Sequence, residues 1–69
     1  MEREGNGGKM KRNALINARK NKNMTQDEVA LLVGLSLSGY RKIEYNERNP
    51  TVKTVKVLIE TLGIDLSMI

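Results

Sequence analysis

The residues of this chain whose types and spacing favour a specific chemistry lie between Leu37 and Lys42. Arg41 and Lys42 are adjacent, and Ser38 precedes them by one helical turn. Arg and Lys side chains bond the O6 and N7 acceptors of guanine, a hydroxyl bonds any base, and a leucine contacts the thymine methyl. Phosphate contact without sequence reading is the alternative for the two cations, and Leu37 is otherwise an ordinary surface leucine. These residue types indicate a surface that reads nucleic-acid bases.

Side chains that support catalysis or hold metals are scarce. The chain has no cysteine and no histidine, which excludes a disulfide and the usual zinc sites. General-base or nucleophile chemistry would fall to carboxylates, Lys, Ser or Tyr, and no convergent cluster of these is visible. We therefore expect no enzyme, such as a nuclease accessory, and no metal, cofactor or small-molecule ligand.

The helix before the basic pair has a well-marked start. Thr25 and Glu28 have the spacing of a capping box, in which each side chain bonds the backbone N–H of the other residue. Met24 and Val29 are placed to close over that start as a hydrophobic staple. Apolar residues then recur at helical spacing. The pattern predicts a helix over residues 26–33.

A sharp corner separates this helix from the next one. Gly34 stands where a chain that leaves a helix needs positive φ, which glycine adopts without a Cβ clash. Ser36 is a good N-cap for a helix over residues 37–45, whose inward face is Tyr40 and Ile43. Two short amphipathic helices that meet at a corner indicate a helix-turn-helix, whose second helix enters the major groove of DNA.

Gly39 lies inside this second helix, where glycine costs about 1 kcal/mol relative to alanine. One explanation is that a side chain would block close approach to DNA. The other is that glycine is neutral on an exposed face. We take close approach as the working hypothesis.

The remaining patterns predict an all-α domain of five short helices. The first covers residues 11–22, with Leu15 inward and basic residues in its last turn, where they suit the helix dipole. Asn46 is expected in a left-handed conformation after the third helix. Thr51 caps a fourth helix over 52–62, Gly63 ends it, and Asp65 caps a final turn over 66–69.

The length and the ends of the chain indicate a single domain. Residues 1–9 are polar and glycine-rich, which predicts a disordered N-terminal extension, and Met10 reads as a natural start. Residues 10–69 then form the domain. A domain of this size buries only about 60% of the surface of its unfolded chain, so we expect marginal stability.

The net charge of +4 is unevenly distributed. Residues 5–26 contain no acidic side chain, and the basic ones there are Lys9, Lys11, Arg12, Arg19, Lys20 and Lys22. A second basic set comprises Arg41, Lys42, Arg48, Lys53 and Lys56. A solvated surface explains such charge alone, but together with a helix-turn-helix it indicates nucleic-acid binding. No apolar run approaches the roughly 20 residues that span a bilayer, so we expect a cytoplasmic protein without membrane contact.

The chain resembles the Cro and phage-repressor (Xre-like) family of DNA-binding domains. The resemblance rests on TQDEVALLVGLS, on the pair Ile43–Glu44, on Pro50 and on a helix that ends in LGI, and it covers about residues 15–69. It implies a compact lambda-repressor-like fold. It also implies a sequence-specific transcriptional regulator, a repressor, that binds a near-palindromic double-stranded DNA operator as a homodimer.

The resemblance also assigns site residues. It places the base readers at Leu37, Ser38, Arg41 and Lys42. The expected contacts to the DNA backbone are Gln26, Ser36, Arg48, Asn49 and Lys53, with Lys11 and Arg12 in reach of the flanking backbone. The N–H groups at the start of a helix favour phosphate, although Gln26 is alternatively just a good helix former.

Two further assignments concern the interior. Arg19 and Glu44 fall on inward faces, and the resemblance pairs them as a buried salt bridge with a structural role. Tyr40 departs from the family pattern, which has a small branched aliphatic residue there. Its ring needs more room, and its hydroxyl needs a partner or water.

The C-terminal apolar residues leave two alternatives open. We expect a dimer contact there, unless these residues simply complete the core of the monomer; they are Ile64, Leu66, Met68 and Ile69. A different function is also possible in principle: a protein-interaction module, such as an antitoxin or anti-repressor partner, with secondary DNA binding. A C-terminal extension that wraps a partner would favour it, whereas this chain ends within the last predicted turn.

Overall fold

The computed structural model describes residues 11–65, so the expectations for residues 1–9 and for a final turn over 66–69 lie outside the described residues. The described part contains the helices α1 (Asn13–Asn21), α2 (Gln26–Val33), α3 (Leu37–Glu44) and α4 (Val52–Leu62), and it has no strand. The prediction of an all-α fold is confirmed. The predicted fifth helix is not among these four.

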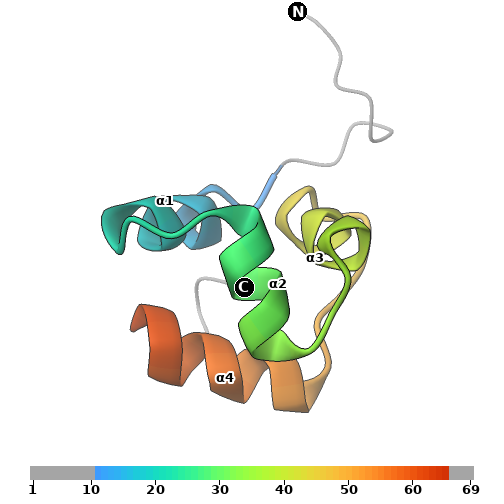
Figure 1. The fold of residues 1–69 in the computed structure, drawn as a ribbon. Coiled ribbons are helices and arrows are strands. Elements are labelled where there is room, and N and C mark those ends of the chain that lie inside the picture. Colours follow the sequence, from blue (N-terminus) through green and yellow to red (C-terminus); the bar gives the residue numbers. More distant parts are fainter. Residues whose placement is uncertain (1–10, 66–69) are drawn as a thin grey trace, which may run out of the picture.

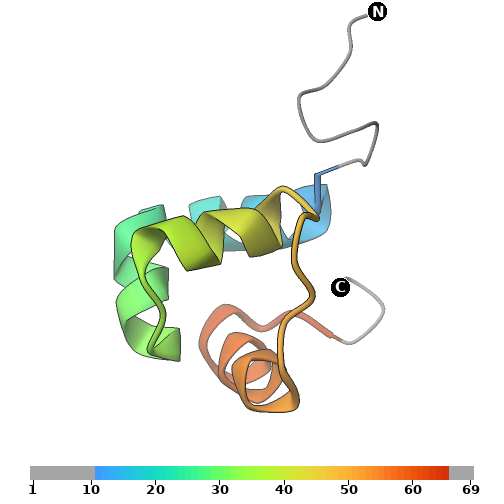
Figure 2. The same ribbon diagram turned by 90° about the vertical axis from the view of Figure 1, so that its right-hand side faces the viewer.

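The helices form two levels joined by α2. In Figure 1, α1 and α4 lie at opposite ends of the upright α2, and Figure 2 shows α3 running alongside α1. Helix α2 packs against both α3 and α4, and α1 packs against α3. This arrangement leaves the side of α3 that faces away from α1 and α2 on the outside of the molecule.

Side-chain caps start three of the helices. At α2, Glu28 N donates to Thr25 Oγ1 at 3.1 Å and Thr25 N donates to Glu28 Oε1 at 2.8 Å, which completes the predicted capping box. Ser36 Oγ accepts from Gly39 N at 3.0 Å and caps α3. Thr51 caps α4 in the same way. The local sequence thus fixes where these helices begin.

Left-handed residues end the helices. Gly34 (φ 75°) follows α2, Gly63 (φ 71°) follows α4 and Asn46 (φ 61°) follows the end of α3, as predicted. Asn23, with φ 58°, adopts the same conformation after α1. Glycine and asparagine tolerate this region better than other residues, so the turns need no further support.

Helix α1 begins two residues later than predicted. Residues 11 and 12 are not helical, and Arg12 N donates instead to the carbonyl oxygen of Glu44 at 2.8 Å. That oxygen belongs to the last turn of α3, whose carbonyls lack partners within the helix. The prediction of a helix from residue 11 was therefore wrong, because the segment docks on α3. Helix α3 itself ends at Glu44, with Tyr45 as its C-cap.

The hydrophobic core collects residues from all four helices and from the segment after α4. Its buried members are Leu15, Val29, Ala30, Tyr40, Ile43, Leu58, Leu62 and Ile64. On α4, Thr54 is buried beside Leu58 and Leu62, whereas Val55 is only half-buried. Ile64 lies in the monomer core. For this residue, completion of the core is therefore the alternative that holds, rather than a dimer contact. Leu66, Met68 and Ile69 lie outside the described residues.

No helix between residues 11 and 65 has both the length and the apolar character required to cross a membrane.

Candidate nucleic-acid interface

Helix α3 presents two very different faces. Tyr40 and Ile43 are buried, while Ser38, Arg41 and Lys42 are exposed and Leu37 is half-buried. The exposed residues lie at positions one and three or four apart, so they share one side of the helix. The four expected base readers are thus brought together on the outward surface of α3.

The corner between α2 and α3 holds this helix at a fixed angle. After the left-handed Gly34, Leu35 N donates to Ala30 O at 2.9 Å, and Ser36 then caps α3. The Ser36 oxygen is engaged by the Gly39 N–H, which leaves its hydroxyl hydrogen as the group for an acceptor such as phosphate. Its expected place beside the DNA backbone stays a prediction.

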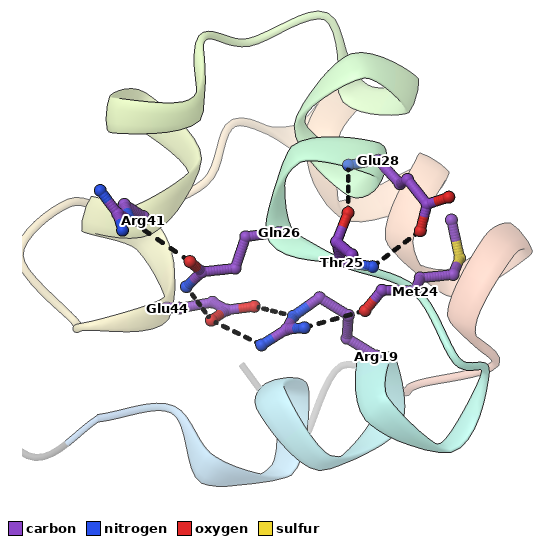
Figure 3. A network of polar contacts seen from close by, with 7 residues as sticks. All are labelled: Arg19, Met24, Thr25, Gln26, Glu28, Arg41 and Glu44. Atoms are coloured by element: carbon purple, nitrogen blue, oxygen red, sulfur yellow. Dashed lines mark hydrogen bonds and ion pairs between the residues drawn. The ribbon is translucent and has the colours of Figure 1, made fainter.

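Arg19 and Glu44 form a buried ion pair between α1 and α3 (Figure 3). Arg19 Nε donates to Glu44 Oε2 at 2.6 Å, and the two side chains are 9% and 1% exposed. Arg19 also donates from Nη2 to Glu44 Oε1 at 3.4 Å and from Nη1 to the Met24 carbonyl at 2.9 Å. The pair joins α1 to the last residue of α3 and to the turn before α2, which is the structural role expected for it.

The charge state of this pair follows from its surroundings. Desolvation by burial on its own would lower the pKa of Arg19, but the hydrogen bond and the charge of Glu44 outweigh it, so the pKa of Arg19 is raised. Arg19 is therefore a permanent cation. A permanent buried cation needs its carboxylate partner at every accessible pH.

Gln26 links the ion pair to the surface (Figure 3). Its Nε2 donates to Glu44 Oε1 at 2.8 Å, and its Oε1 accepts from Arg41 Nε at 3.3 Å. Sequence reasoning places Gln26 on the DNA backbone and does not anticipate either bond. The structure places its amide group between the core carboxylate and an exposed reader.

Arg12 has a structural role that sequence reasoning missed. Its Nη1 donates to Ile43 O at 2.6 Å and to Arg48 O at 3.1 Å, and its Nη2 donates to Asn49 Oδ1 at 3.1 Å. Burial lowers the pKa of Arg12. The Arg12 guanidinium thus fastens the loop after α3 to the segment before α1, and the expected contact of Arg12 with the flanking DNA backbone stays a prediction.

The neighbouring lysine also contacts the protein. Lys11 Nζ lies 5.1 Å from the centre of the Tyr45 ring, a cation–π distance. Together with Arg12, Lys11 docks the segment before α1 on the end of α3. The runs of basic residues in the sequence gave no sign that these two cations have aromatic and carbonyl partners far along the chain.

The loop and the start of α4 hold the remaining backbone candidates. Arg48, Asn49 and Lys53 are exposed. Because Asn49 Oδ1 accepts from Arg12, its Nδ2 is the end of the amide left to donate outward, as a phosphate contact requires.

A side chain at Gly39 would meet the loop after α3. A Cβ atom there would lie 3.0 Å from Arg48 Nη1 and 3.3 Å from Ser36 Oγ. Arg48 is exposed and can move aside, so the close approach to DNA remains the working hypothesis for Gly39.

Residues 11–65 hold no group of three or more Asp, Glu, His or Cys side chains placed to bind a metal ion. The site's chemistry is that of hydrogen-bond donors and positive charge. Such groups recognise phosphate oxygens and the acceptors of base edges.

A capped helix with a polar, basic outer face, set at a left-handed corner against a second helix, defines a helix-turn-helix domain. Residues 15–69 match the model of the family described as Helix-turn-helix, of the Xre and Cro type, and the chain belongs to this family. No curated protein and no solved structure matches the chain. The protein is accordingly a DNA-binding helix-turn-helix regulator, and members of this family typically have no enzymatic activity.

Proposed function

We propose that this protein is a transcriptional repressor that binds a near-palindromic double-stranded DNA operator as a homodimer, with α3 in the major groove. The observation that carries the proposal is the outer face of α3, where Ser38, Arg41 and Lys42 are exposed opposite a fully buried Tyr40 and Ile43. A helix can lie in the major groove of DNA only when its polar face is not packed against the rest of the protein.

The backbone contacts in this proposal come from both sides of α3. Ser36 lies before it, and Arg48, Asn49 and Lys53 follow it, all of them exposed. The net charge of +4 favours approach to a polyanion. These contacts set the register of the protein on the duplex, and the α3 side chains then discriminate bases.

Dimerisation is proposed on grounds of specificity. A single domain of this size reads only a few base pairs, whereas two copies related by a two-fold axis double the contacts and require a palindromic site. Because Ile64 is buried in the monomer, the proposed dimer contact is confined to Leu66, Met68 and Ile69. Sedimentation of the protein with and without an operator duplex would give the stoichiometry.

The interaction-module alternative is supported by an exposed apolar set. Leu31 and Leu32 on α2 are 83% and 50% exposed, and Val52 at the start of α4 is 75% exposed. Large exposed hydrophobic side chains often mark protein contacts. If this were the primary role, the variant Leu31→Ser would abolish activity in cells while leaving DNA affinity unchanged.

Selection of bound duplexes from a random DNA pool tests the proposed function. We expect enrichment of a short site with two-fold symmetry, whose half-sites lie about one helical turn (roughly 34–36 Å) apart. Enrichment of a single unrepeated half-site would contradict the dimer, and a pool that stays random would contradict sequence-specific binding.

A further inference from the structure

The amide of Gln26 sits between a core carboxylate and an exposed arginine of α3. We propose that Gln26 is a positioning residue, which holds Arg41 so that its terminal Nη1 and Nη2 groups read guanine. This inference rests on the proposed function, and it gives the Gln26 side chain an orienting role in addition to the phosphate contact expected of it.

The orientation of the Gln26 amide is set from the core. The Glu44 side chain is 1% exposed, and both of its oxygens accept hydrogen bonds from Arg19. At 2.8 Å, Glu44 Oε1 can be faced only by the NH2 end of Gln26, because the carbonyl end would set two acceptors against each other. The Gln26 carbonyl is thereby turned toward the surface.

The outward-facing Gln26 carbonyl accepts a hydrogen bond from a donor on α3. Arg41 Nε meets it at 3.3 Å, and Figure 3 shows the rest of the guanidinium extending away from the protein. A donor at position 41 fits this carbonyl, whereas an acceptor would be repelled. The Arg41 side chain is thus restrained before any DNA arrives, which reduces the side-chain freedom that binding would remove.

The bond to Gln26 also determines which atoms of Arg41 remain for DNA. A guanidinium has donors on Nε, Nη1 and Nη2, and it pairs with two acceptors either side-on through Nε or end-on through both Nη atoms. With Nε held by Gln26, the end-on pair is left for guanine O6 and N7. Lysine carries its three donors on one nitrogen, so Arg41→Lys could not bond Gln26 through one nitrogen and present two others side by side to guanine.

The first experiment uses the free protein and needs no DNA. Proton exchange of the Arg41 Nε–H with water is measured by nitrogen-15 NMR in the parent, in Gln26→Met and in Gln26→Glu. Gln26→Met removes the acceptor at similar length, so exchange at Arg41 should become several-fold faster. Gln26→Glu keeps an acceptor and should keep exchange slow. The exposed Arg48 Nε–H serves as the control and should not respond.

The second experiment measures base preference by selection from random DNA. Gln26→Met should reduce the preference at the base pair read by Arg41 roughly fivefold, which is a part of the discrimination that a bidentate pair contributes. Preference at the pair read by Lys42 should not change. Gln26→Glu should recover the Arg41 preference, although its charge beside Glu44 lowers the melting temperature.

Double variants separate positioning from a general loss of structure. Gln26→Met should add nothing at the Arg41 base pair once Arg41→Ala is present, while it should be additive with Lys42→Ala. Cooperative melts of every variant establish that the domain is folded during the measurement. A merely structural effect would lower affinity for all sequences alike and leave the preferences intact.

The outcomes separate the two proposals. A parent that selects an operator, combined with an unchanged Gln26→Met profile or unchanged Arg41 exchange, overturns the positioning role alone. If the parent enriches no sequence, the proposed function fails and the base-reading role of Arg41 fails with it. Faster exchange together with a loss confined to the Arg41 base pair supports the inference.

Discussion

At the scale of single residues, some polar side chains on the outer face of this domain also form hydrogen bonds within the protein. Arg41 is exposed on the outer face of α3, yet its Nε bonds Gln26. Tyr40 is the opposite case. It is fully buried, and among the described residues its hydroxyl has no hydrogen-bond partner. A polar atom in that state lowers stability, because it has given up water without replacement.

Replacement of Tyr40 by phenylalanine should therefore stabilise the protein. Removing an unsatisfied buried hydroxyl while keeping the ring should raise the free energy of unfolding by about 1 kcal/mol at neutral pH. Urea denaturation of the parent and Tyr40→Phe measures this. A loss of stability on replacement would show that the hydroxyl is satisfied after all, for example by a buried water.

The same residue predicts a pH dependence. Desolvation first, and the Glu44 carboxylate next, raise the pKa of Tyr40 above its ordinary value of 10.0. A raised folded-state pKa gives stability that is complete below about pH 10 and is lost as the pH rises further, by up to about 1.4 kcal/mol per pH unit. Above pH 10, the free energy of unfolding of the parent should fall relative to that of Tyr40→Phe. Absorbance at alkaline pH should show that the Tyr40 phenol ionises above the ordinary pKa of tyrosine.

Residues that read bases and residues that contact phosphates should respond differently to truncation. Arg41→Ala should cost about 1–3 kcal/mol at its cognate base pair and relax the preference there. Lys53→Ala should weaken binding to all sequences alike and reduce the slope of the salt dependence by about one contact. Binding titrations on the operator and on unrelated duplexes compare the two. Equal losses on both DNAs for Arg41→Ala would mean that Arg41 contacts phosphate.

At the scale of elements, the local signals in the sequence predicted the helix limits well. Thr25, Ser36 and Thr51 bond N–H groups three residues ahead, so each cap is encoded within one short stretch. The left-handed Gly34 is equally local. The elements and their corner were therefore predictable, and with them the outward position of the α3 residues.

The contacts between elements were harder to predict. Arg12 bonds atoms 31 to 37 residues away, and nothing near it in the sequence marks it as different from the other basic residues. The Gln26 bond to Arg41 depends on the orientation of a single amide group. The sequence shows how many basic residues the chain has, but only the packed structure shows which of them bond other parts of the protein.

The ion pair between α1 and α3 gives a test at this scale. Arg19→Leu leaves the buried Glu44 without its partner, and Glu44→Leu does the same to Arg19, so each should cost about 3–5 kcal/mol. The double replacement should recover much of the loss, because apolar residues can substitute for a buried ion pair. Thermal melts of the four proteins without DNA measure the coupling. Small additive effects would mean that the pair contributes little to holding the two helices together.

At the scale of the whole molecule, positive charge and apolar surface are arranged around the small core. Arg12, Lys11 and Arg19 have partners within the protein. Among residues 11–65, other exposed cations lie on α3, on the loop after it and on α4, and Lys20 and Lys22 lie at the end of α1. The cations on α3 and on the loop after it favour a DNA footprint centred on α3.

Salt dependence should reveal this footprint. Each phosphate neutralised on duplex DNA releases counterions, so log affinity should fall with log salt by about 0.9 for every contact. The proposed set of Arg48, Lys53 and the α3 cations, doubled in a dimer, predicts a steep slope. Arg12→Gln and Lys11→Gln should reduce that slope less than Arg48→Gln and Lys53→Gln, because the Arg12 and Lys11 side chains are held against α3 and the loop after it. Titrations on one operator at several salt concentrations give the slopes. A slope that falls equally for all four variants would mean that the segment before α1 leaves α3 and joins the DNA contact.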